Sequence, residues 1–167
     1  MVIRVPLSAI DFEPPAAIPP PTTSNSYPGS SATPAGLLLL AGEYRQAAGL
    51  LMGNGRKGVA ASYAPFRLNA IHAIELYLSA FLLSVGEPPE AIRALGHDLA
   101  TRSERAVLRG LVLRQRTILH MRSLSGAREY LVSRYAVELL SSMSQLNQLS
   151  ATLEEVASKV TRRMQRA

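Results

Sequence analysis

The sequence has no cysteine and no tryptophan, and only three phenylalanines among its 167 residues. Without cysteine the chain forms no disulfide, thiolate metal site or cysteine nucleophile, and it suits a reducing compartment. Aromatic residues make up 5% of the chain and hydrophobic residues 47%, so the core must consist mainly of Leu, Ala, Val and Ile. This composition favours helices packed on helices over a sheet rich in aromatic residues.

Long uninterrupted apolar runs are also missing. The run 37–41 is short, and the stretch 71–85 contains a histidine and a glutamate, so neither reaches the roughly 20 apolar residues of a membrane span. The first residues, MVIRVPLSAIDFEPP, reach Asp11 and Glu13 too soon for a secretory signal. We therefore expect a soluble, cytoplasmic protein with no membrane partner.

Proline is concentrated at the start of the chain, where residues 1–28 hold seven of the eleven prolines. Ser, Thr and Asn fill much of the sequence up to Thr33. Such a segment cannot bury enough apolar surface to offset its ordering entropy. The sequence therefore predicts a disordered arm over 1–33 and one helical domain over 34–167.

Helix signals follow one another through this domain, and no long stretch alternates with the period of a strand. The predicted helices are 34 to about 52, 65 to 86, 88 to 96, one from Asp98 or from a capping box at Thr101, 111 to 124, and one from about Tyr135 to near the C-terminus. The helix from about Tyr135 is predicted because its apolar positions, from Leu139 to Val160, are spaced by three and four residues. The predicted fold is an all-α, antiparallel up-and-down bundle of about five helices with a long C-terminal helix.

Basic residues exceed acidic residues by 18 to 12, which gives a net charge of +6. Between Arg102 and Arg134 there are eight arginines and two acids, a local excess of 8 − 2 = +6. Guanidinium groups bind phosphates and carboxylates in bidentate fashion. The segment therefore indicates either an anion-binding surface or a solvated basic helix face.

Four short segments, in their order along the chain, resemble a known family. They are HAIELYLSAFLLSVG at 72–86, GHDLA at 96–100, RGL at 109–111 and SRYAVELL at 133–140. Together they resemble the HEPN-like family of small helical proteins, in which a helix with HAIEL precedes a Gly-His-Asp-Leu corner. The likeness covers the layout of roughly residues 35–160, and Ser79 stands where the family's first segment usually has Lys.

The resemblance implies a helical bundle, commonly a homodimer, with a role tied to RNA in a stress or defence system, in some cases beside an antitoxin-like partner protein. Some members resemble metal-independent ribonucleases, and others resemble non-catalytic binding modules. The active members carry an Arg, four to six further residues and then a His. Such a pair works without a metal, because the Arg stabilises charge on the phosphate while the His transfers a proton.

Arg114 and His120 satisfy this spacing, with Gln115 as the polar neighbour, and are the predicted catalytic pair. Arg67 and His72 satisfy it earlier in the chain. Six residues on a straight helix place two side chains about 240° apart. Arg114 and His120 therefore converge only if the helix breaks or if a dimer brings two copies together.

The helix at 65–86 carries His72, Glu75 and Ser79 on one narrow stripe, and Arg67 lies off that stripe. We predict a hydrogen bond between His72 and Glu75, with an Arg from another helix compensating the buried carboxylate. The polar groups of this apolar helix are thus expected to stabilise the fold or, alternatively, to line a pocket.

His97 and Asp98 follow Gly96 at a corner between two helices. Asp98 can cap the next helix, and His97 can bond to a terminal carbonyl. With His72 and Glu75 they form a predicted structural polar cluster. We predict no metal and no cofactor, because neither the metalloprotease helix spacing nor a ferritin-type Glu-x-x-His motif is present.

Basic and aromatic side chains interleave in REYLVSRY, where Arg128, Tyr130, Arg134 and Tyr135 are the predicted binding residues. Such residues stack on splayed bases and contact phosphates, although tyrosines packed beside exposed arginines have the same pattern. The terminal KVTRRMQRA could bind phosphate or complement the helix dipole.

The preferred hypothesis is a non-catalytic HEPN-like module that binds RNA or a partner protein. One alternative is a metal-independent, toxin-like endoribonuclease that uses Arg114 and His120. The other is a helical protein–protein interaction module without a nucleic-acid role.

Overall fold

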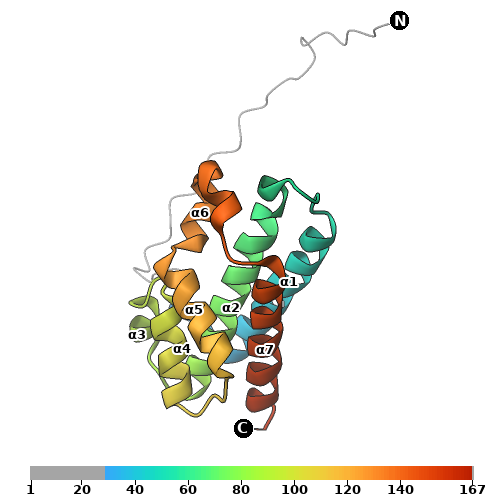
Figure 1. The fold of residues 1–167 in the computed structure, drawn as a ribbon. Helices are drawn as coiled ribbons and strands as arrows, with labels where there is room; N and C mark the ends of the chain where they lie inside the picture. The colour runs from blue at the N-terminus through green and yellow to red at the C-terminus, as the bar shows by residue number, and fades with distance from the viewer. Residues whose placement is uncertain (1–28, 167) are drawn as a thin grey trace, which may run out of the picture.

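The structure is a computed structural model that describes residues 29–166. Within this range every regular element is a helix, which confirms the all-α bundle (Figure 1). The elements are α1 (Pro34–Gly53), η2 (Ala60–Tyr63), α2 (Ala64–Ser84), α3 (Pro89–Arg93), α4 (Leu99–Leu108), α5 (Gln115–Gly126), α6 (Glu129–Tyr135), η3 (Val137–Ser142) and α7 (Leu146–Met164), where η marks a 3-10 helix. Most of the predicted arm, residues 1–28, lies outside the described part.

The central element is α2, which packs against α1, α4, α6 and α7 (Figure 1). Its side chains are buried on nearly every side, with Phe66, Ile74, Leu78 and Phe81 at most 1% exposed. A helix that is apolar all round requires such surroundings. Together with η2, it is long and apolar enough to cross a membrane by length and composition, but 67% of that window is buried inside the fold. It is therefore the core helix of the bundle, as expected of a soluble protein.

The starts of α1 and α4 follow local capping chemistry. The Thr33 hydroxyl accepts the Gly36 N–H at 3.0 Å, and Pro34 occupies the first turn of α1, as predicted. In α4 the cap is Asp98, whose Oδ1 accepts the N–H groups of Ala100 and Thr101. Of the two predicted starts the earlier is thus correct, and the capping box at Thr101 is not used.

The boundaries of α5 differ from the prediction at both ends. Residues 111–114 are not helical: α4 is followed by a turn with Gly110 at φ +94°, and the chain has no regular structure from there to α5. At the other end α5 continues through Gly126. Arg128, two residues after α5, adopts a left-handed conformation with φ +50°, and this residue separates α5 from α6.

The predicted long C-terminal helix is present as α7, with 19 residues, but it begins at Leu146 and not near Tyr135. The chain leaves helical geometry at Ala136 (φ −108°, ψ 76°) and is extended at Met143 and Gln145 before α7 begins. The apolar positions from Leu139 onward therefore belong to two separate elements, η3 and α7. As a result, α6 and α7 are separate helices, and each of them packs on α2.

Candidate functional site

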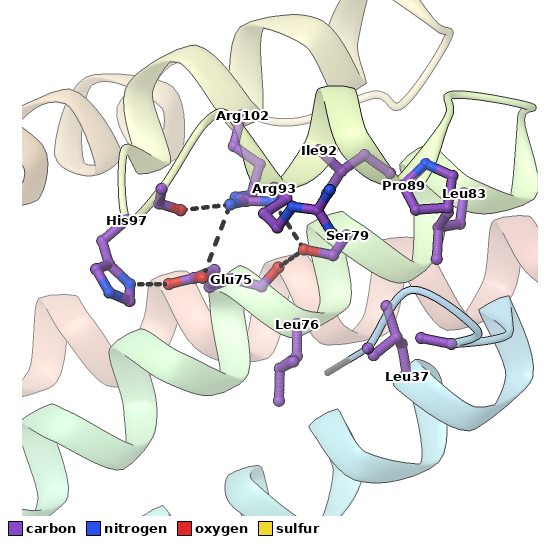
Figure 2. A pocket seen from close by; sticks show the side chains of 13 residues that line it. Leu37, Glu75, Leu76, Ser79, Leu83, Pro89, Ile92, Arg93, His97 and Arg102 are labelled. Carbon is purple, nitrogen blue, oxygen red and sulfur yellow. Dashed lines mark hydrogen bonds and ion pairs between the residues drawn. The ribbon is translucent and has the colours of Figure 1, made fainter. Parts of the chain in front are cut away.

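The Gly-His-Asp-Leu corner folds onto α2, where Glu75 and His97 meet (Figure 2). The His97 Nδ1 lies 2.9 Å from Glu75 Oε2. Among the described residues, Glu75 thus bonds with His97 and not with His72 as predicted. This contact joins two of the segments that carry the family resemblance.

Arg102 of α4 supplies the cation that was expected from another helix (Figure 2). Its Nη1 donates to the Ser79 hydroxyl at 2.8 Å, its Nη2 donates to the Gly96 carbonyl, and Nη2 lies 3.7 Å from Glu75 Oε1. The residue is only 3% exposed, and burial lowers the pKa of its guanidinium. Its Nε is buried and has no partner within the described chain. Sequence alone could not identify this arginine, because several others follow it in the basic segment.

These polar groups form the floor of a pocket of about 310 Å³, which we call the corner pocket (Figure 2). Its apolar walls come from α1, α2 and the α3 region, and include Leu37, Leu76, Leu83 and Ile92. A few convergent polar groups beneath apolar walls are typical of a ligand pocket. The floor offers both hydrogen-bond donors and acceptors.

The remaining two members of the predicted polar cluster, His72 and Asp98, do not line the corner pocket. The His72 ring packs edge-on against the Tyr44 ring, with centroids 4.4 Å apart, and burial lowers the pKa of His72. Asp98 is the cap of α4 and also bonds to the Thr101 hydroxyl at 2.6 Å. The predicted cluster is therefore split into a corner site and a packed histidine.

A second concavity of about 520 Å³ lies on the other side of His97, and we call it the corner hollow. The residues that line it are His97, Asp98, Ala100, Arg122, Ser125, Gly126, Arg128 and Tyr130. The His97 and Tyr130 rings lie 4.8 Å apart at an interplanar angle of 37°. His97 lines both the corner pocket and the corner hollow, so the two concavities adjoin at this residue.

The two arginines of the corner hollow differ in their partners. Arg122 pairs with Glu104 at 3.0 Å, and both side chains are about half exposed. The Arg128 side chain is exposed and forms no hydrogen bond or ion pair within residues 29–166. The structure thus brings Arg128 and Tyr130 of the predicted binding set to the Gly-His-Asp-Leu corner, a juxtaposition that the sequence did not indicate.

Arg134 and Tyr135, the other half of that set, do not line the corner hollow. Both are exposed at the end of α6, and Tyr135 is 77% exposed.

The predicted catalytic pair points into separate environments. Arg114 precedes α5 with a side chain that is 63% exposed, and its Nε lies 3.7 Å from Glu155. His120 is only 3% exposed, and its Nδ1 lies 2.8 Å from the Thr152 hydroxyl of α7. Its Nε2 is buried without a partner in the described chain. The two side chains therefore share no site, and the cause is not helical phase, because Arg114 is extended and lies before the first residue of α5.

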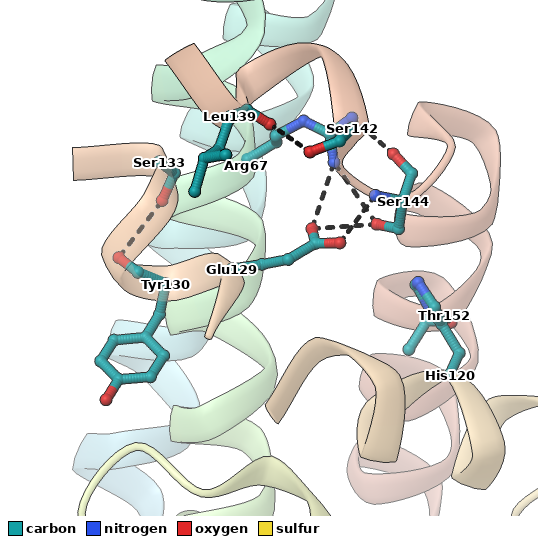
Figure 3. A network of polar contacts seen from close by, with 9 residues as sticks. All are labelled: Arg67, His120, Glu129, Tyr130, Ser133, Leu139, Ser142, Ser144 and Thr152. Carbon is teal, nitrogen blue, oxygen red and sulfur yellow. Dashed lines mark hydrogen bonds and ion pairs between the residues drawn. The ribbon is translucent and has the colours of Figure 1, made fainter. Parts of the chain in front are cut away.

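Arg67, the earlier candidate, belongs to a buried network at the start of α7 (Figure 3). Its Nη1 lies 3.3 Å from Glu129 Oε2, and its Nη2 donates to the Ser144 carbonyl. Glu129 also accepts the Ser144 N–H at 2.6 Å and the Ser144 hydroxyl at 3.0 Å. Because His72 packs on Tyr44, Arg67 and His72 share no site.

Among residues 29–166 there is no group of three or more His, Cys, Asp or Glu that could hold a metal ion. Comparisons with protein-family models, with curated proteins and with solved structures found no match. The geometry of the corner is therefore the evidence from which a function can be argued.

Proposed function

We propose that the chain is a non-catalytic, HEPN-like helical module that binds single-stranded RNA at the corner. The observation that carries this proposal is the composition of the corner hollow, which combines an exposed arginine, Arg128, with the His97–Tyr130 ring pair. Cations and stacking rings in one concavity are the groups by which proteins hold unpaired nucleotides.

The cations would hold the RNA backbone. Within residues 29–166 the Arg128 side chain has no partner to give up, and the pair between Arg122 and Glu104 is exposed and therefore weak. A phosphate placed between the two guanidinium groups would gain charge-assisted hydrogen bonds at little cost.

A splayed base would stack on the rings and enter the corner pocket. Unpaired bases can be stacked on aromatic side chains and hydrogen-bonded along their edges. The floor of the pocket provides an acceptor in the Glu75 carboxylate and a donor in the Arg102 guanidinium, whereas the Ser79 hydroxyl already donates to the Glu75 carbonyl at 2.7 Å. The leucines of the pocket walls can flank the base. Since His97 lines both concavities, one nucleotide can reach from the hollow into the pocket.

The burial of His120 supports binding without cleavage. A general acid or base must reach the proton that it transfers, and His120 is covered by α7 and bonded to Thr152. Burial also lowers its pKa. We further propose, from the family resemblance, that the module is a cytoplasmic homodimer of a stress or defence system.

The test is equilibrium binding of a fluorescent single-stranded RNA and of the matching duplex, in EDTA and at several salt concentrations. We expect the single strand to bind more tightly and its affinity to fall with salt. Tyr130→Ala should weaken binding by about 1–3 kcal/mol, and Arg128→Ala should reduce the salt slope by about one. Arg56→Ala, an exposed arginine in the loop after α1, is the matched control and should change neither.

Two outcomes would contradict the proposal. Cleavage of RNA in EDTA that is lost in His120→Ala would establish the endoribonuclease alternative. Absence of binding at low salt would leave the protein–protein interaction module.

A further inference from the structure

A second basic site lies at the end of α7, and the proposed RNA site does not use it. Lys159 lies three and four residues before Arg162 and Arg163, which places these three on one face of α7. Arg166 follows in the turn after the helix ends at Met164. The four cations surround a hollow of about 180 Å³ whose opposite wall is the turn Gly110–Val112. We call this site the basic hollow.

The charge of the basic hollow is uncompensated within residues 29–166. None of its four cations forms an ion pair or hydrogen bond there, and no acidic residue lines it. The acids of α7 are engaged elsewhere, because Glu154 bonds to Arg45 at 2.8 Å and Glu155 accepts the Arg114 N–H at 2.7 Å. The site therefore has four positive charges around one concavity.

The helix dipole does not account for all of these cations. A positive side chain is favourable in the last turn of a helix, but the effect falls off beyond that turn. Arg162 and Arg163 meet this condition, whereas Lys159 lies five residues before Met164, the last residue of α7. Like charges three and four residues apart also repel, so an anion that neutralises them would be stabilising.

We propose that the basic hollow binds a chain of adjacent phosphate groups, either an inorganic oligophosphate or the phosphate tail of a nucleotide. The four positive charges around one concavity match a chain of phosphates, which carries several negative charges, better than a single phosphate group. Arginine favours phosphate through its planar fork of donors.

The basic hollow and the corner hollow are distinct sites. The turn 110–112 precedes the first residue of α5, and Arg128 follows its last. The helix between them has 12 residues and spans about 18 Å. The oligophosphate proposal can thus be tested apart from RNA binding.

The experiment is calorimetric titration of the full chain with tripolyphosphate, ATP and AMP at fixed ionic strength. Tripolyphosphate should bind at least tenfold more tightly than AMP. The double variant Arg162→Glu/Arg163→Glu should weaken tripolyphosphate binding at least tenfold, whereas Arg56→Glu/Lys57→Glu, which changes the net charge equally, should stay within twofold. ATP distinguishes an inorganic oligophosphate from a nucleotide as the ligand. If ATP binds as tightly as tripolyphosphate, the site also accepts the phosphate tail of a nucleotide. Weaker binding of ATP indicates an inorganic chain.

Equal losses in the two double variants, or AMP binding as tightly as tripolyphosphate, would overturn the proposal. Circular dichroism checks that both variants fold, which is expected because all four substituted side chains are exposed. Arg128→Ala should leave tripolyphosphate binding unchanged, so failure of the oligophosphate site and failure of the RNA site give different results.

Discussion

Glu129 is a buried carboxylate at the first position of α6, only 2% exposed, and it holds together residues from distant parts of the chain (Figure 3). Glu129→Ala would leave the Arg67 guanidinium, itself 6% exposed, without its ion partner. Removing one partner of a buried pair typically costs about 3–5 kcal/mol. We expect that loss in the free energy of unfolding, measured by urea denaturation.

The matched control is Glu104→Ala, which breaks the half-exposed pair with Arg122. Exposed pairs contribute little, so the change should stay within about 0.5 kcal/mol. Equal effects of the two substitutions would show that the Glu129 network does not stabilise the fold.

His120 makes the stability of the fold sensitive to acid. Burial lowers its pKa, with Glu129 raising it and Arg67 lowering it to smaller extents. The folded state therefore binds fewer protons than the unfolded state below pH of about 6.5, and stability falls as the pH drops from there toward the folded pKa. His72, whose pKa burial also lowers, acts in the same direction.

The measurement is the free energy of unfolding between pH 7 and pH 5. His120→Asn keeps a polar atom near the position of Nδ1 for the Thr152 hydroxyl but cannot be protonated, so its stability should depend less steeply on pH than that of the wild type. An unchanged pH dependence in this variant would mean that His120 is not the sensitive group.

At the scale of elements, the start of α4 depends on a single carboxylate. Asp98→Ala removes the acceptor for the N–H groups of Ala100 and Thr101 and should cost about 0.5–2 kcal/mol. Asp98→Asn, which is an equally good cap, should retain most of the stability near neutral pH. Thermal unfolding of the two variants measures the difference, and equal losses would contradict the capping role.

The Asp98 carboxylate has its own pH dependence. The Thr101 hydroxyl lowers its pKa, and burial partly opposes this effect. Its contribution to stability is therefore present above the unfolded pKa of about 3.9 and is lost as the pH falls through the lower folded pKa. The wild type should lose this part of its stability below pH 4, and Asp98→Asn should not.

Local chemistry made some elements predictable and long-range contacts determined others. The Thr33 cap and the apolar run of α2 are local signals, and both gave nearly correct helix boundaries. The break between α6 and α7 has no such signal, because no Gly or Pro lies between Tyr135 and Leu146 and the apolar spacing continues across it. Its stabilising contacts to Ser144 come from Arg67, 77 residues earlier in the chain, and from Glu129, 15 residues earlier. Ser142 and Ser144 also bond to the backbone or to side chains there, in competition with helix formation.

At the scale of the whole molecule, the parts of the corner were predictable but their assembly was not. The motif at 96–100 and the basic, aromatic segment that begins at Arg128 are each visible in the sequence. Only the fold of α5 and α6 brings Tyr130 to within 4.8 Å of His97. The same fold buries His120 against α7, which spacing along the chain could not indicate.

Binding of single-stranded RNA at the corner is the central claim, and amide chemical-shift mapping tests it most directly. Titration of the ¹⁵N-labelled protein with a short single-stranded RNA in EDTA should shift the amides of Asp98, Ala100, Gly126 and Tyr130. The amides of Gly55 and Gly58, in the loop after α1, should not move. Shifts confined to residues 110–112 and 159–166, or no shifts at all, would contradict the claim.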